Sequence, residues 1–372
     1  MHRSSRVRAA ALGALGALLA AVAGCRSHAP YWVGAAGQFD GSEPARENLR
    51  GVTLAAEEVN AAGGIDGHAV RLVIHDDGGI GESAARVAHE LVADRRVSVI
   101  VGHTTSTAML AAAPVYDGRI AAIATTATAP MLSGISPWVF RVVSSDSVTG
   151  AQLAQFSAQR GWRSAAILYQ NDVYGRGLAD AYRANFPGRV ISSDPVPADV
   201  QDLSTFVRFY RQFAPDVVFV VAGRSKIPVL LRKALLDRHL HVAILASEGS
   251  MDLRLGSQGA DQIYVEAPFS SDDGGPQATR FAARFEARYG HAPSHDAALA
   301  YDGALTAFAA LRAVGPDRSA IRTYLDRLDA AHAPVGATGR IYFDSLGDRV
   351  GTHAVLLQVK QGRLAVLASV LH

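Results

Sequence analysis

Two apolar runs, each followed by a cluster of hydroxyl residues, constrain the fold of this chain most. Residues 97–101 (VSVIV) are mostly β-branched, which is typical of a parallel strand covered on both faces. Residues 103–107 (HTTST) and an alanine-rich segment up to Tyr116 follow, which predicts a helix with a hydroxyl cap. A second strand is predicted at 120–123, and three threonines follow it at 125, 126 and 128. Such strand–helix units indicate an α/β fold with a parallel sheet.

Both hydroxyl clusters are expected at the carboxyl ends of strands, where open α/β sheets bind ligands. The first cluster also begins a helix, and free N–H groups and the helix dipole favour an anion there. The alternative is that these residues only cap helices and close turns. Two clusters on neighbouring strands, without a lysine or an acidic residue among them, favour a site for a small anion such as a carboxylate. A phosphate loop is not indicated, because the chain lacks the G-x-x-x-x-G-K-[ST] motif.

Composition excludes several classes of function. With 372 residues, of which 49% are hydrophobic, the chain is long enough for two lobes with separate cores. The net charge is only +2, and no basic stripe with interleaved aromatic residues indicates nucleic-acid binding. No H-E-x-x-H, C-x-x-C or G-x-S-x-G motif is present, so no metal site, cofactor or serine-hydrolase motif is predicted.

The first 25 residues have the pattern of a secretory signal. Three arginines among the first eight residues precede an apolar segment at 9–23, and Cys25 follows a small residue. This arrangement resembles the lipobox of bacterial lipoproteins, which implies that Cys25 is lipidated and anchors the protein to a membrane. The alternative is a plain secretory signal with an incidental cysteine. Because Cys25 is the only cysteine, the mature chain is expected to contain no disulfide.

Alternating strands and helices are interrupted and then resumed along the chain. A first series ends near residue 143, and the polar residues 144–147 are predicted to form a hinge or a helix cap. A second series runs to about residue 266, and residues 270–276 read as a second crossing. A strand is predicted at 339–344, followed by a terminal hairpin of 355–359 and 364–367. This pattern favours two lobes that can close around a ligand.

An ordered set of short motifs carries a family resemblance. They are LAAEEVNAAGGIDG (54–67), VGH (101–103), AT (127–128), VFR (139–141), YG (174–175), AYD (300–302), and FD (343–344) with GD (347–348). Each motif is weak alone, but together they resemble the leucine/isoleucine/valine-binding protein family of type I periplasmic solute-binding proteins, over residues 33–362. The resemblance implies two doubly wound, mainly parallel lobes joined by three crossovers, comprising 31–143 with 273–349 and 144–272 with 350–372. It also implies a non-enzymatic receptor that delivers an amino acid or a related small molecule to an ABC permease.

The same resemblance assigns ligand-binding residues. Ser106 would hold the ligand carboxylate, and Thr128 would do so with its hydroxyl and backbone N–H. The carbonyl of Thr126 would accept a hydrogen bond from the ligand ammonium group, and Glu248 would pair with that group. Tyr174 of the second lobe would close over the ligand. The structural alternatives are a helix cap for Ser106, turns for the threonines, loop packing for Tyr174 and a solvated carboxylate for Glu248.

The chain departs from the family pattern at the pocket for the ligand side chain. Arg224 follows Gly223 where many relatives have an aromatic residue, and the first loop (37–43) lacks the usual proline. An arginine with an acid nearby suits a polar side group, so we predict that the ligand is not leucine. The alternative is that Arg224 forms a salt bridge at the rim of the cleft.

Two further classes of function stay open. The first is a ligand-sensing ectodomain that signals to a separate partner instead of supplying a permease. The second is a hydrolase in which Ser106 is the nucleophile and His103 the base, although no orienting acid stands at a known spacing. A structural or adhesin role would require that the molecule has no cleft that can close.

Overall fold

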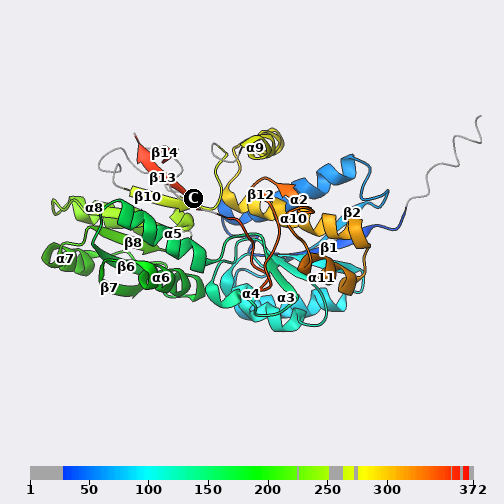
Figure 1. The fold of residues 1–372 in the computed structure, drawn as a ribbon, viewed down its shortest axis with the longest axis horizontal. Helices are drawn as coiled ribbons and strands as arrows, with labels where there is room; N and C mark the ends of the chain where they lie inside the picture. Colours follow the sequence, from blue (N-terminus) through cyan, green and yellow to red (C-terminus); the bar gives the residue numbers. More distant parts are fainter. Residues whose placement is uncertain are drawn as a thin grey trace, which may run out of the picture.

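The computed structural model describes residues 28–223, 226–250, 263–271, 275–352, 354–360 and 363–367. Cys25 with the rest of the predicted signal segment, and Arg224, lie outside the described residues. The described chain forms two lobes that lie side by side, each built around its own sheet (Figure 1).

The first sheet is parallel and has its switch point at its central strand. Its strands are β1 (Tyr31–Gly37), β2 (Val70–Asp76), β3 (Val97–Val101), β4 (Ala122–Ala124) and β5 (Val139–Arg141). The spatial order is β2-β1-β3-β4-β5, so the direction of winding reverses between β1 and β3. Every residue of β3 is buried, as its apolar sequence predicts. Ligand sites of open α/β sheets lie at such a reversal.

Helices cover both faces of the first sheet. They are α2 (Glu43–Ala61), α3 (Gly81–Ala93), α4 (Ser106–Tyr116), α9 (Gly275–Tyr289), α10 (His295–Val314) and α11 (Arg318–Asp326). α3 and α4 form the core of one face, and α2, α9, α10 and α11 form that of the other. α2 and α10 approach closely at Gly51, where a Cβ atom would lie 2.2 Å from the carbonyl oxygen of Ala297. α10 is long and apolar enough to span a membrane, but 72% of its most apolar window is buried, which identifies it as a core helix.

The second sheet has a parallel part and an antiparallel edge. Its strands are β6 (Ser164–Gln170), β7 (Arg189–Val196), β8 (Val217–Val221), β9 (Ala243–Ala246), β10 (Ile263–Ala267), β13 (Val355–Lys360) and β14 (Arg363–Val366). Its helices are α5 (Asp146–Gln159), α6 (Val173–Asn185), α7 (Ser204–Phe213) and α8 (Ile227–Leu236). The order is β14-β13-β10-β9-β8-β6-β7, and β13 pairs antiparallel with both β10 and β14, whereas the other described pairs are parallel. α5 and α6 pack on one face, and α7 and α8 on the other (Figure 1).

The chain passes between the two sheets three times. It does so after β5, after β10 and before β13. The predicted fold class, two doubly wound α/β lobes of mainly parallel strands, is therefore confirmed. The lobe boundaries at 143/144 and 349/350 fall in connecting segments, the boundary at 272/273 lies outside the described residues, and all three stay a prediction.

The prediction of one strand over 339–344 is wrong. The structure has a short antiparallel pair instead, formed by β11 (Val335–Gly336) and β12 (Gly339–Arg340). Ile341 and Phe343 are buried in the core of the first lobe. Apolar residues alternate in this segment because alternate side chains are buried in the core. No neighbouring strand pairs with the segment over its full length.

Candidate functional site

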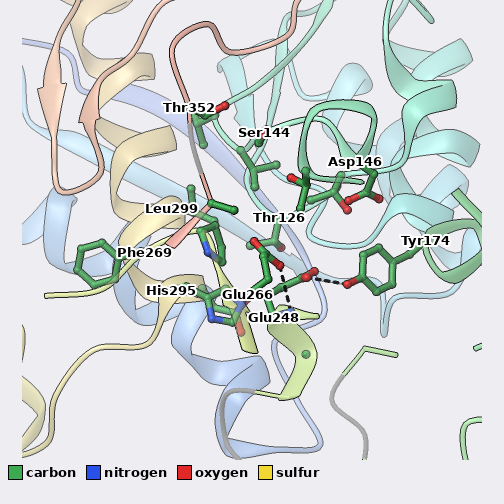
Figure 2. A pocket seen from close by; sticks show the side chains of 18 of the residues that line it. Thr126, Ser144, Asp146, Tyr174, Glu248, Glu266, Phe269, His295, Leu299 and Thr352 are labelled. Atoms are coloured by element: carbon green, nitrogen blue, oxygen red, sulfur yellow. Dashed lines mark hydrogen bonds and ion pairs between the residues drawn. The ribbon is translucent and has the colours of Figure 1, made fainter. Parts of the chain in front are cut away.

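A cleft of about 650 Å³ lies between the lobes and is lined by residues of both. Its walls are formed by segments at the carboxyl ends of β1, β3 and β4 in the first sheet and of β6, β8, β9 and β10 in the second. Ligands of open α/β sheets bind at these strand ends. The cleft brings together all the predicted site residues that the structure describes: Ser106, Thr126, Thr128, Tyr174 and Glu248. Figure 2 labels Thr126, Tyr174 and Glu248 among them. Their roles towards a ligand stay predictions.

The two hydroxyl clusters of the first lobe meet at the N-terminus of α4. Thr105 is the residue that caps this helix, and Ser106 is its first residue. The Ser106 hydroxyl accepts the backbone N–H of Ala129 at 3.1 Å. The Thr126 hydroxyl donates to the carbonyl oxygen of Thr104 at 2.6 Å. These bonds join both loops into one wall beside a helix N-terminus, whose first N–H groups have no partner within the helix and favour an anion.

Arg141 on β5 holds the backbone of Thr128 in place. Its Nη1 donates to the carbonyl oxygens of Thr128 at 2.8 Å and Ala129 at 3.0 Å, and its Nε donates to Asp348 at 2.6 Å. Arg141 is buried. In the described part of the chain, the buried Thr128 hydroxyl has no hydrogen-bond partner of standard geometry. The backbone of Thr128 is thus anchored, and its hydroxyl lies close enough to Asp146 to lower the pKa of that carboxyl. The sequence analysis included Arg141 in a motif but gave it no role.

In the second lobe, a tyrosine and two glutamates form a chain of contacts. The Tyr174 hydroxyl donates to Glu248 Oε2 at 2.6 Å, and the backbone N–H of Glu248 donates to Glu266 Oε2 at 3.2 Å (Figure 2). Burial, followed by the charge of Glu248, raises the pKa of the Glu266 carboxyl well above its usual range. Burial and the same charge also raise the pKa of Tyr174, so its hydroxyl stays a donor. Glu266 is a cleft residue that the sequence analysis missed.

Asp146 is a second acid that the sequence analysis missed. It is the first residue of α5, and its backbone N–H donates to the carbonyl oxygen of Thr128 at 2.9 Å. Its side chain lines the cleft, is only 1% exposed, and its Oδ2 has no hydrogen-bond partner among the described residues. Burial and then the charge of Glu248 raise the pKa of Asp146 well above its usual range, although the Thr128 hydroxyl and Arg141 oppose this.

The positive charge of Arg349, a buried residue at the edge of the cleft, is already engaged. Its guanidinium donates to the carbonyl oxygens of Val142 at 2.7 Å, Thr338 at 2.9 Å and Arg340 at 2.9 Å. Nη1 and Nη2 of Arg349 therefore tie chain segments together, whereas its buried Nε has no hydrogen-bond partner among the described residues.

The geometry does not support a nucleophile–base pair of Ser106 and His103. His103 is fully buried, its Nδ1 contacts Asp77, and its Nε2 lies 2.7 Å from the Tyr116 hydroxyl. Both ring nitrogens are therefore engaged with groups other than Ser106. The Ser106 hydroxyl itself accepts a backbone N–H.

One group of three potential metal ligands occurs in the described part of the chain, and it is not among the residues that line the cleft. It comprises Glu43, Glu47 and His291, whose ligand atoms lie within 4.8 Å of one another. Arg50 Nη1 lies 2.8 Å from Glu47 and 2.5 Å from Glu43. Arg46 also lies 2.7 Å from Glu43, so two arginines already pair with the two carboxylates, which carry no argument for a metal.

Comparison with known proteins agrees with this architecture. A family model described as periplasmic binding protein matches residues 35–363. The amino acid binding protein of Pseudomonas aeruginosa is 28% identical over 316 residues, which are 78% of this chain and 84% of that protein. The Leu/Ile/Val-binding protein of Escherichia coli K12 is 26% identical over 61% of this chain, and the match spans 64% of that protein, just under two thirds. A leucine binding protein from Thermotoga maritima has the same fold, with a TM-score of 0.81 at 23% identity over 91% of this chain and 97% of that one. Because the family model covers most of its length, this chain belongs to the periplasmic binding protein family.

Proposed function

We propose that this protein is an extracytoplasmic solute receptor that captures an amino acid or a related small polar molecule between its lobes and delivers it to an ABC permease. The family and the named binding proteins among its relatives support a binding role. The observation that carries the proposal is the chemistry of the two walls of the cleft. One wall offers a helix N-terminus with hydroxyls, and the other offers a tyrosine–glutamate pair.

The two walls suit the opposite charges of a zwitterion. Ser106 and Thr128 would hold the carboxylate beside the N-terminus of α4, and the carbonyl of Thr126 and the Glu248 carboxylate would hold the ammonium group. Charge-assisted hydrogen bonds of this kind contribute about 1.5–3 kcal/mol each. A ligand that touches both lobes stabilises the closed state, whereas a ligand that touches one lobe does not. The acids in the cleft favour a ligand with an ammonium group over a simple carboxylate such as benzoate.

A thermal-shift screen followed by isothermal titration calorimetry tests the proposal. The probes are the common α-amino acids, their amides, and benzoate as a carboxylate without an ammonium group. We expect at least one α-amino acid to raise the melting temperature. Ser106→Ala should weaken its binding roughly tenfold or more, since it removes a hydroxyl beside the ligand carboxylate.

Ser319→Ala, an exposed hydroxyl on α11, is the matched control and should bind as the wild type does. Stabilisation by benzoate alone would contradict the zwitterion assignment. Equal binding by wild type and Ser106→Ala would remove Ser106 from the site.

The proposed route to the membrane depends on the first 25 residues. We infer that they are a lipoprotein signal and that Cys25 carries the lipid anchor of a periplasmic or other extracytoplasmic protein. The mass of the mature N-terminal peptide, taken from the membrane fraction, tests this. An unmodified Cys25 in that peptide would contradict it.

A further inference from the structure

Acidic side chains outnumber cationic ones along the described walls of the cleft. The carboxylates are those of Asp146, Asp172, Glu248, Glu266 and Asp296. Two of them have local roles, because Asp172 caps α6 and Asp296 lies 3.6 Å from the ring of His295. Arg349 is the only arginine or lysine among the described lining residues, and its Nη1 and Nη2 donate to oxygens of the chain itself, which leaves only its Nε without a partner there.

The other three carboxylates gather around the Tyr174 hydroxyl, and each of their charges contributes to the raised pKa of Tyr174. Glu248 contacts this hydroxyl directly. Asp146 and Glu266 are 1% and 3% exposed, so water does little to solvate either charge. Asp146 Oδ2 has no hydrogen-bond partner of standard geometry in the described part of the chain, although Asp146 lines the open cleft and the Thr128 hydroxyl lies close enough to lower its pKa (Figure 2). A buried carboxylate oxygen with no partner costs free energy until a donor reaches it.

A single ammonium group neutralises one of these three acids and leaves two. A metal ion does not fit them as a compact ligand set, because the ligand atoms of these three described residues do not all lie within 4.8 Å of one another. The three acids lie near one hydroxyl without closing around a single ion, which suits a cation carried by an organic molecule. Such a molecule can place two positive groups several bonds apart.

Building on the proposed function, we propose that the cleft selects amino acids with a second cationic group, an ammonium or a guanidinium. The α-ammonium lies against Glu248, and the second cation lies against Asp146 and Glu266. This arrangement gives Asp146 Oδ2 a charged donor in addition to the nearby Thr128 hydroxyl.

Proton release accompanies binding in this proposal. The pKa values of Asp146 and Glu266 are raised in the empty cleft, first by burial and then by Glu248. A cation beside them favours their charged forms and expels the protons they hold. Affinity for a dibasic ligand therefore rises with pH as these two acids ionise. Arg141 and the Thr128 hydroxyl favour the ionised form of Asp146. Tyr174 stays neutral, because its pKa is raised. A neutral side chain such as that of leucine expels no proton.

Calorimetry at pH 6 and pH 8, in two buffers of different ionisation enthalpy, tests the proposal. The probes are L-arginine, L-lysine and L-ornithine, compared with L-leucine and L-glutamine. We expect a dibasic amino acid to bind at least tenfold more tightly than either neutral one at pH 8. We also expect it to release protons into the buffer and to bind more weakly at pH 6.

Two variants assign the effect to the acids. Asp146→Asn and Glu266→Gln each keep the side-chain shape and remove one charge, so each should reduce the preference for the dibasic ligand at least fivefold. Glu286→Gln, at an exposed position of α9 outside the cleft, should not change it. Circular dichroism verifies the folding of each variant. The preference of the wild type for the dibasic ligand is measured without these variants and tests the proposal even if they fail to fold.

The outcomes separate this inference from the proposed function. If leucine or glutamine binds as tightly as the dibasic amino acids at pH 8, and no proton is released, the selection of a second cation is wrong and the receptor function stands. If the folded protein binds neither neutral nor dibasic amino acids, both proposals fail.

Discussion

Replacing Arg141 with methionine should destabilise the first lobe and loosen the wall of the cleft. The guanidinium is buried, lies 2.6 Å from Asp348 and donates to the carbonyl oxygens of Thr128 and Ala129. Both carbonyl oxygens keep another donor, the backbone N–H groups of Asp146 and Leu132 respectively. The main loss is therefore the ion pair.

Breaking a buried ion pair costs about 3–5 kcal/mol, because the remaining charge is left without its partner. Asp348 is 14% exposed and also accepts from the Ser133 hydroxyl at 2.7 Å, which places the expected loss near the lower end, at about 3 kcal/mol. For a folding unit of roughly 150–250 residues, this corresponds to a fall in melting temperature of about 6–12 °C. Thermal unfolding followed by circular dichroism measures it.

The chain offers a matched control in an exposed pair of similar geometry. Arg288 lies 2.8 and 2.9 Å from the two carboxylate oxygens of Glu57, and these side chains are 51% and 42% exposed. Arg288→Met should cost less than about 1 kcal/mol, since exposed pairs contribute little. Asp348→Asn should also cost less in the Arg141→Met background than in the wild type. Equal losses for Arg141→Met and Arg288→Met would refute the argument that burial makes the Arg141 pair strong.

Two further predictions concern stability. Gly51→Ala should cost about 1–3 kcal/mol, because its Cβ atom would lie 2.2 Å from the Ala297 carbonyl oxygen and force α2 away from α10; an unchanged melting temperature would contradict this. Hydrogen bonds from Arg96 lower the pKa of Asp94 to about 2, below its usual 3.8, so this carboxylate stabilises the fold above about pH 4 and loses that effect as the pH falls towards 2. The difference in melting temperature between wild type and Asp94→Asn should therefore shrink from pH 5 to pH 2, and a constant difference would exclude this linkage.

The fold could be predicted because its strands are buried on both faces and therefore read as apolar, β-branched runs. Residues 97–101 are the clearest case, and every one of them is buried. The same logic brought Ser106 and Thr128 to one edge of the sheet, since parallel strands end on the same side. The same reasoning gave a wrong prediction for residues 339–344, because their apolar side chains are buried although no strand of that length forms.

The acids of the cleft could not be predicted in the same way. Asp146 stands in the polar segment 144–147, where a hinge or a cap explains the residue type equally well. Glu266 ends a short apolar strand, and an acid there gives no sign of whether it meets water or the other lobe. Only the three-dimensional packing shows that both are buried and face one cavity.

Arg349 also limits how the molecule can open. It stands at the third passage of the chain between the lobes, yet it donates to Val142 at the first passage and to Thr338 and Arg340 in the first lobe. The first and the third of the three connecting segments are thus joined by a hydrogen bond. We therefore expect any opening of the lobes to be a rotation about the point where these two connecting segments meet.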